Sequence, residues 1–239
     1  ATQERGHEIR TFMPKWGNIN ERRNQLHEVI RLTGMNIIVD DTDHPLIIKV
    51  ASIQQLRTQV FFILNDDYFR NHLNTRDDKG EEYADNDERT IFFARSVLET
   101  VKKQSWYPDV IHCHGWISHL LPVYLKKAYK DDPIFTNSKV VISFYDNVPN
   151  ETFDENFIEK AMFGGVGEKE LNLLKEPNGI NLAKLAAKYA DGAIMVGDGI
   201  PSSLVSYCRD RGLSVLKSKS KSISDGSYIE EYNAFYDQL

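Results

Sequence analysis

The first third of the chain alternates between short β-branched, apolar segments and clusters of turn-forming residues. This pattern predicts strands, because β-branched side chains fit a pleated sheet and Asp, Asn, Gly and Pro interrupt it. Residues 1–5 have the pattern of a helix end that stops at Gly6, and Pro14 closes the strand that follows. The strands predicted here cover residues 8–13, 35–39, 45–52 and 59–64.

From residue 86 onward the apolar residues recur at helical spacing and alternate with short apolar runs. In the segment 87–103, Ile91, Ala94, Val97 and Leu98 share one helix face. Strands that alternate with helices in this way are typical of a mostly parallel sheet with helices on both faces, so the sequence predicts an α/β fold. The further predicted helices are 116–129, 181–189, 202–211 and 228–236, and the further strands are 109–114, 139–144, 193–196 and 213–216.

Composition excludes several classes of protein. The 239 residues carry a net charge of −6, which gives no reason to expect nucleic acid or an anionic membrane as a partner. The longest apolar runs, such as 60–64, are far shorter than the roughly 18 residues that span a bilayer. The polar opening residues do not resemble a signal peptide, and two cysteines are too few for a disulfide framework. We therefore expect a cytoplasmic protein.

Candidate chemistry is expected just beyond the carboxyl ends of the predicted strands, where open α/β sheets bind their ligands. Four segments lie at such ends: 65–69, 112–116, 145–147 and 197–199.

The run His112-Cys113-His114 raises the question of a metal site. Alternation along a strand places the two imidazoles on one side of the sheet and Cys113 on the other. Two ligands do not make a site, and the sequence offers no third at a recognisable spacing. The favoured interpretation is therefore that no metal binds, that His112 is hydrogen-bonded in the interior and that His114 ends the strand.

Trp116, Tyr145 and Asp146 have side chains that suit a sugar ligand. An exposed indole stacks on the apolar face of a sugar, and a phenol and a carboxylate bond its hydroxyl groups. Each has a structural alternative. Trp116 can pack into the core at the start of a helix, and Asp146 can form an Asx turn.

Several motifs, in order along the chain, resemble those of the glycogen and starch synthases. They are residues 5–10, 19–23, 108–114 and 120–126 and the triplet Tyr189-Ala190-Asp191. The resemblance implies a Rossmann-like domain like the N-terminal half of a two-domain GT-B glycosyltransferase, formed by residues 1–239 as a single domain. It also implies transfer of glucose from ADP-glucose or UDP-glucose to an α-1,4-glucan, with no cofactor and no catalytic metal.

The resemblance further implies that His114, Trp116, Tyr145 and Asp146 contact the glucan or the donor glucose. The sequence departs from the family at these positions. His114-Gly115-Trp116-Ile117 stands where the family has His-Asp-Trp-His, and Tyr145-Asp146 stands where it has His-Asn.

Two larger family features are not found in the sequence. They are the Lys-Thr-Gly-Gly-Leu loop, expected with a first strand and the start of a first helix ahead of Ala1, and the C-terminal domain with its cationic clamp. Transfer needs positive charge near the departing diphosphate and a closed cleft. We therefore expect the chain to be inactive alone and to need a protein that supplies a C-terminal GT-B domain. The alternative is a non-catalytic relative, a pseudoenzyme that binds glucan, sugar nucleotide or protein in a regulatory role.

Overall fold

The computed structural model describes residues 3–53, 58–70, 72–146, 148–149, 152–218 and 226–239. The chain divides into two compact units, Ala1–Gln104 (unit 1) and Ser105–Leu239 (unit 2), and each is described by itself. A single domain over residues 1–239 stays a prediction.

Unit 1 is built on a sheet with the strand order β1-β5-β4-β2. Strand β3 also pairs with β4 but lies outside this order. β1 runs parallel to β5, whereas β4 runs antiparallel to β5, β3 and β2. All four strands predicted for this part are confirmed, but β2 was missed because two exposed residues carry no pattern. The strands are β1 Arg10–Pro14, β2 His27–Glu28, β3 Met35–Val39, β4 Thr42–Ile53 and β5 Thr58–Leu64.

The local turns of unit 1 follow from single residues. Gly6, the predicted stop, has a φ of 90° and follows the 3₁₀ turn η1 (Gln3–Arg5). Asp40 and Asp41 both adopt positive φ between Val39 and Thr42, which makes the two-residue hairpin that joins β3 to β4. A second 3₁₀ turn, η2, covers Ile30–Leu32.

Helix α1 (Asn86–Lys103) packs against β3 and β5 and is buried along most of its length. The apolar face predicted from the sequence is buried, but so are Arg89, Thr90 and Thr100. The hydroxyl groups of Thr90 and Thr100 donate to the carbonyl oxygens of Asn86 and Ser96, at 2.9 and 2.7 Å. Because these bonds stay within the helix, the two threonine hydroxyl groups are satisfied although they are buried.

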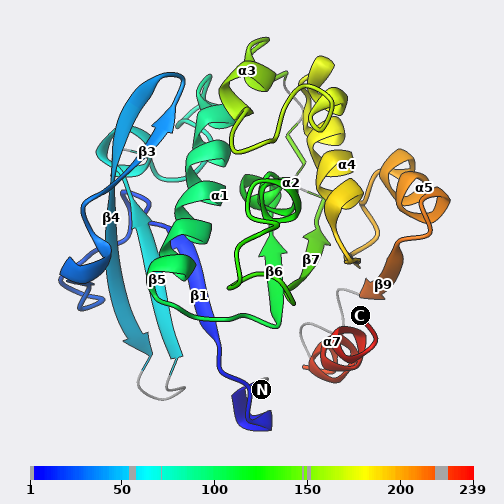
Figure 1. Ribbon diagram of the computed structural model, residues 1–239, viewed down its shortest axis with the longest axis horizontal. Helices are drawn as coiled ribbons and strands as arrows, with labels where there is room; N and C mark the ends of the chain where they lie inside the picture. Colours follow the sequence, from blue (N-terminus) through cyan, green and yellow to red (C-terminus); the bar gives the residue numbers. More distant parts are fainter. Residues whose placement is uncertain (1–2, 54–57, 71, 147, 150–151, 219–225) are drawn as a thin grey trace. The chain divides into compact units, whose positions relative to one another are not determined.

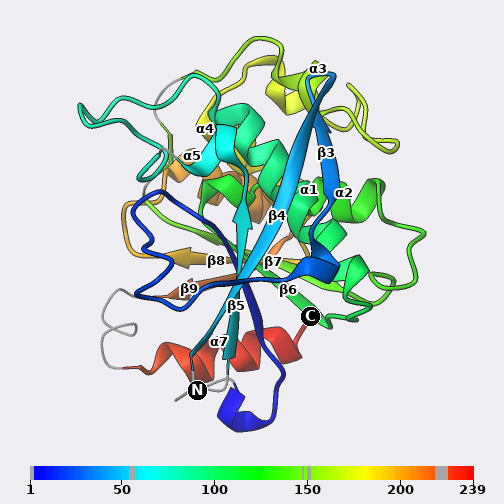
Figure 2. The same cartoon turned by 90° about the vertical axis from the view of Figure 1, so that its left-hand side faces the viewer.

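Unit 2 is the parallel α/β part of the chain (Figure 1). Its four strands pair in the order β6-β7-β8-β9, and every pairing is parallel. Figure 2 shows α4 and α5 on one side of this sheet and α7 on the other, as predicted for a sheet covered on both faces. The strands are β6 Val110–His114, β7 Lys139–Phe144, β8 Gly192–Val196 and β9 Ser214–Ser218.

The helices of unit 2 agree with the sequence except at two places. The helix predicted over 116–129 is divided into a 3₁₀ turn, η5, and a separate helix, α2. Pro122 lies in the first turn of α2, where a missing backbone N–H is tolerated. Helix α3 was not predicted, because five residues in a polar segment show no period. The bounds are η5 Trp116–Ser118, α2 Leu121–Lys127, α3 Phe157–Ala161, η6 Asn172–Lys175, α4 Gly179–Tyr189, α5 Ser202–Asp210 and α7 Tyr228–Asp237.

None of the helices in the described residues has the length and apolar character that crossing a membrane requires.

Candidate functional site

The carboxyl end of β6 presents two histidines on the face of the sheet that α7 covers. The rings of His112 and His114 lie 3.9 Å apart between centroids, and Cys113 is buried on the opposite face near Ser118. The predicted alternation is therefore confirmed. Burial raises the pKa of the Cys113 thiol to about 12, so this cysteine stays protonated and unreactive.

His112 is held by two hydroxyl groups. Its Nδ1 lies 2.6 Å from Tyr236 Oη of α7, and its Nε2 lies 2.7 Å from Ser143 Oγ of β7. Burial, and then the neighbouring His114, lowers the pKa of His112 well below its ordinary value, so the ring is neutral. This is the hydrogen-bonded interior histidine that the sequence favoured. Within the described residues, no three His, Cys, Asp or Glu side chains group as metal ligands.

His114 and Tyr145 form a polar pair at the exposed edge of the sheet. Nδ1 of His114 lies 2.8 Å from the phenol oxygen of Tyr145, which directly follows β7. Desolvation by surrounding groups lowers the pKa of His114, and burial raises the pKa of Tyr145. Both groups are therefore neutral near pH 7 and offer the donors and acceptors that sugar hydroxyls require.

Asp146 lies beside a pocket of about 570 Å³ at the carboxyl ends of β7 and β8. The start of α4 forms one wall, where the Asn178 side chain accepts a hydrogen bond from the Asn181 N–H at 2.9 Å. Asp146 and Glu176 contribute carboxylates, and no lysine or arginine occurs among the lining residues in the described part of the chain. These are Asp146, Val148, Pro149, Glu176, Asn178, Gly179, Ile180, Asn181, Gly199 and Pro201.

Two glycines allow neighbouring segments of the chain to pack closely against each other at the wall of this pocket. A Cβ on Gly199 would lie 2.9 Å from Cβ of Asp146, and one on Gly179 would lie 2.8 Å from a methyl group of Val148. Sequence reasoning placed 145–147 and 197–199 at strand ends but missed Asn178, Gly179 and Glu176, which precede or begin a helix. Asn147, named with this segment, lies outside the described residues.

Trp116 starts the 3₁₀ turn after β6 and is only 7% exposed. Its ring packs against Phe153, with 5.8 Å between centroids and 46° between planes. This position agrees with the core-packing interpretation. A sugar contact by Trp116 stays a prediction.

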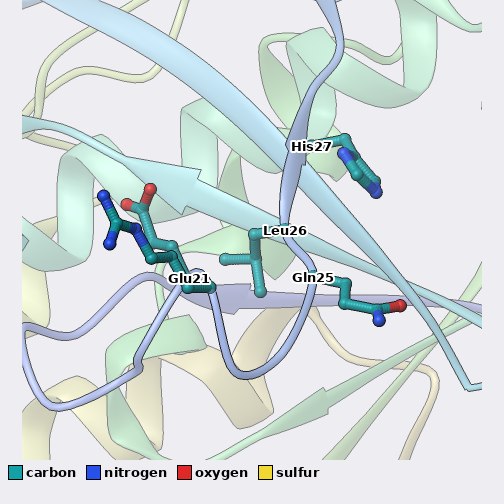
Figure 3. A pocket seen from close by; sticks show the side chains of 5 residues that line it. Glu21, Gln25, Leu26 and His27 are labelled. Atoms are coloured by element: carbon teal, nitrogen blue, oxygen red, sulfur yellow. The ribbon is translucent and has the colours of Figure 1, made fainter.

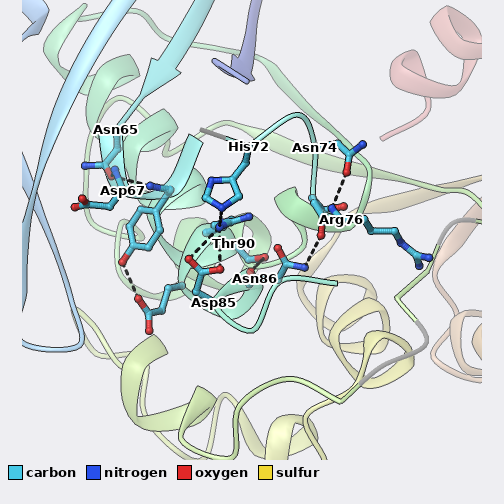
Figure 4. A network of polar contacts seen from close by, with 12 residues as sticks. Asn65, Asp67, His72, Asn74, Arg76, Asp85, Asn86 and Thr90 are labelled. Atoms are coloured by element: carbon cyan, nitrogen blue, oxygen red, sulfur yellow. Dashed lines mark hydrogen bonds and ion pairs between the residues drawn. The ribbon is translucent and has the colours of Figure 1, made fainter. Parts of the chain in front are cut away.

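In unit 1, residues 65–69, which follow β5, belong to a polar network around the start of α1 (Figure 4). Oδ1 of Asn65 accepts hydrogen bonds from the N–H groups of Asp67 and Tyr68, which fixes the π-helical turn η4 (Asp66–Arg70). The phenol of Tyr68 donates to Glu88 at 2.9 Å and lies 3.0 Å from His44.

Arg89 is buried and lies at the centre of a second group of contacts in this network. Its guanidinium lies 2.8 Å from Asp85 and 3.2 Å from His72, and it covers the ring of Tyr83 at 4.5 Å. Sequence reasoning missed this arginine. The contacts of Arg89 with His72 and Asp85 stabilise the segment 72–85 against the start of α1.

A second hollow, of about 510 Å³, lies on unit 1 (Figure 3). It is lined by Glu21, Arg22, Gln25, Leu26 and His27. The carboxylate of Glu21 pairs with Lys49 at 2.7 Å and Lys15 at 3.5 Å, and the hydrogen bond from Lys49 lowers its pKa. Because that carboxylate is engaged in the fold, we assign no ligand to this hollow.

Comparison with known proteins decides the family. The family model for the starch synthase catalytic domain matches residues 1–206. The chain belongs to this family. The resemblance stated from the sequence motifs is thereby confirmed, and this starch synthase-type domain is a glycosyltransferase domain.

Individual relatives agree with this assignment. A glycogen synthase of Chlorobium limicola is 33% identical over 194 residues, covering 80% of this chain and 39% of the relative. One from Chlorobaculum parvum is 28% identical over 245 residues, covering all of this chain and 50% of the relative. The chain thus spans half or less of these relatives.

A solved structure supports the fold. The catalytic domain of starch synthase IV from Arabidopsis thaliana, bound to ADP and acarbose, aligns with a TM-score of 0.69 at 16% identity, covering 91% of this chain and 45% of that one. The starch synthase-type domain therefore has the predicted α/β fold of the N-terminal half of a GT-B glycosyltransferase.

Proposed function

We propose that this chain acts in α-1,4-glucan synthesis from ADP-glucose or UDP-glucose, by holding the glucan at the carboxyl edge of unit 2. His114, Tyr145 and Asp146 are the groups that contact the sugar in this proposal. The curated relatives are glycogen synthases, and the structural neighbour binds ADP and acarbose. A cytoplasmic location is part of the proposal, and the free buried thiols of Cys113 and Cys208 suit a reducing compartment.

The observation that carries the proposal is the charge of the pocket beside Asp146. Among the described residues, its lining has two carboxylates and no lysine or arginine. A glucan is neutral, and carboxylates and amides bond its hydroxyls well. A diphosphate, by contrast, would meet like charge there without any cation to compensate.

The same charge argument supports inactivity of the chain by itself. Glucosyl transfer builds negative charge on the departing diphosphate, and enzymes stabilise that charge with fixed cations and dipoles. The pocket residues that the structure describes offer no such cation. In this proposal a partner with a C-terminal GT-B domain supplies it and closes the cleft.

The experiment measures transfer and binding separately. The purified chain is incubated with radiolabelled ADP-glucose or UDP-glucose and glycogen, and binding of maltoheptaose is measured by calorimetry. We expect no incorporation of label and measurable binding of maltoheptaose. Incorporation that depends on this chain alone would overturn the inactivity, and absence of maltoheptaose binding would overturn the glucan site.

A second candidate is a non-catalytic, regulatory relative that binds glucan, sugar nucleotide or protein. It is favoured by Gly115 and Tyr145, which stand where the resembled family has Asp and His. Addition of a separately expressed C-terminal glycogen synthase domain distinguishes the two. Restored transfer supports the synthase role, whereas glucan binding without transfer under these conditions supports the regulatory role.

A further inference from the structure

Helix α7 reaches the histidines of β6 through one tyrosine. Tyr236 Oη lies 2.6 Å from His112 Nδ1, and the opposite nitrogen of that ring lies 2.7 Å from Ser143 Oγ. Both ring nitrogens are thus engaged, one by α7 and one by β7. Two directional bonds on opposite sides of a ring fix its orientation.

The helix itself is seated by apolar packing. Tyr232 and Phe235 form a buried cluster with Val141, Ile194 and Val196 of the sheet. A Cβ on Gly192 would lie 2.8 Å from the ring of Phe235, so the close approach of α7 to β8 depends on a glycine. The place of Tyr236 is therefore set by the fold rather than by its hydroxyl bond alone.

We propose that Tyr236, acting through His112, is a positioning residue for the His114–Tyr145 pair. The ring of His112 lies against that of His114, with 3.9 Å between centroids and 34° between planes. An imidazole held on both sides gives His114 a fixed surface to pack on, and this directs His114 Nδ1 to the phenol of Tyr145 at 2.8 Å. Docking of α7 thereby sets the geometry of the glucan edge. The expected effect on glucan binding rests on the proposed function, whereas the positioning of His114 by Tyr236 and His112 does not.

Other titratable groups surround the same two rings. Burial raises the pKa values of Tyr145 and Tyr232, and Ser143, which lies 2.7 Å from His112, lowers them. The negative charge of Glu231 on α7 also raises the pKa of Tyr232. A test must therefore separate the Tyr236 hydroxyl from the rest of α7, and the helix offers a matched control. Tyr228 packs against Tyr232, with 5.2 Å between centroids, rather than against either histidine.

The first test uses NMR titration of the histidine rings in the wild type, Tyr236→Phe and Tyr228→Phe. Loss of the Tyr236 hydroxyl frees Nδ1 of His112, so we expect the ¹⁵N shift of that nitrogen to change. Because desolvation lowers the pKa of His114, a His114 ring that is no longer held gains contact with water, and we expect its titration midpoint to rise toward the ordinary value near 6.5. Tyr228→Phe should leave both unchanged. An unaltered midpoint and ring shift of His114 in Tyr236→Phe would overturn the positioning role.

The second test measures maltoheptaose binding by calorimetry in the same three proteins. We expect about fivefold weaker binding for Tyr236→Phe, as for the loss of one hydrogen bond, and no change for Tyr228→Phe. Equal affinity of Tyr236→Phe and wild type would overturn the link to the glucan edge. If the wild type binds no maltoheptaose, the proposed function fails, while the NMR result still decides the positioning. Far-UV circular dichroism checks that each variant is folded.

Discussion

His114 Nδ1 and the phenol oxygen of Tyr145 lie 2.8 Å apart, and they join two neighbouring parallel strands at the edge where such sheets bind ligands. The pair is neutral near pH 7, because desolvation lowers the pKa of the imidazole and raises that of the phenol. A neutral pair exchanges donors and acceptors with sugar hydroxyls without the cost of moving a charge out of water.

The first prediction concerns the phenol. Tyr145→Phe removes one hydroxyl from the edge and leaves His114 Nδ1 without that partner. We expect maltoheptaose affinity to fall about tenfold, which corresponds to roughly 1.4 kcal/mol. Calorimetric titration measures the change. Tyr107→Phe, at a tyrosine that is 62% exposed in the same unit, is the control and should bind like the wild type.

The second prediction concerns the carboxylate of Asp146. An ionised carboxylate accepts stronger hydrogen bonds than an amide, so Asp146→Asn should weaken maltoheptaose binding by about fivefold. Since the ligand is neutral, affinity should change less than about twofold when NaCl rises from roughly 50 to 500 mM. Asp131→Asn, at a highly exposed carboxylate, is the matched control. A steep dependence on salt would contradict recognition of a neutral ligand by this pocket.

Much of the fold could be predicted from the sequence, because its elements are local and periodic. The bounds of β3 and β7 agree with the prediction at both ends, and β6 differs by one residue. The location of His112 and His114 on one and the same side of the sheet followed from alternation alone. These features depend on period-two and period-3.6 patterns, which survive in almost any tertiary context.

The rest of the site could not be predicted, since it depends on contacts between distant residues. The bond from Tyr236 to His112 spans 124 positions, and α7 carries only the apolar pattern of a closing helix. Nothing in the sequence distinguishes Arg89 from an exposed charged residue on a helix. In the structure it is fully buried, in contact with Asp85, His72 and Tyr83. The burial of Trp116 was left open because its packing partner, Phe153, is distant in the sequence.

The third prediction concerns Trp116 and separates packing from sugar contact. Trp116→Ala should lower the free energy of unfolding by about 3–5 kcal/mol, because a large buried ring is lost beside Phe153. Trp116→Phe should retain most of that stability. If Trp116 only packs, this second variant migrates like the wild type in glycogen-containing native gels. Retarded migration of the wild type that is lost in a folded Trp116→Phe variant would instead establish the sugar contact.

The fourth prediction concerns the wall of the pocket. Gly179→Ala places a methyl group 2.8 Å from Val148 Cγ1 and 2.9 Å from Pro149 Cδ, besides the carbonyl oxygen of Pro149. We expect a loss of about 1–3 kcal/mol in stability from overpacking, despite the better helix propensity of alanine, and weaker maltoheptaose binding as the wall moves. Urea unfolding and calorimetry measure the two effects. Gly167→Ala is the control, because its added Cβ meets only Glu170 Oε2 at 3.7 Å and its φ is not positive.

The last prediction concerns His119, which is buried against Phe144 after η5. Neither of its ring nitrogens has a hydrogen-bond partner among the described residues, and burial lowers its pKa from 6.5 to about 3. The folded protein therefore keeps His119 neutral, whereas the unfolded chain binds a proton below pH 6.5. The free energy of unfolding should fall as pH decreases from 6.5 toward 3, by about 1.4 kcal/mol per pH unit for this proton.

His119→Leu removes the buried ring nitrogens and keeps an apolar side chain of similar size against Phe144. We expect equal or greater stability than the wild type near pH 7 and a shallower loss toward about pH 5, measured by urea unfolding at each pH. His112 and His114, whose pKa values burial also lowers, keep part of the slope in this variant. Parallel curves for wild type and His119→Leu would mean that His119 does not stay neutral in the folded protein.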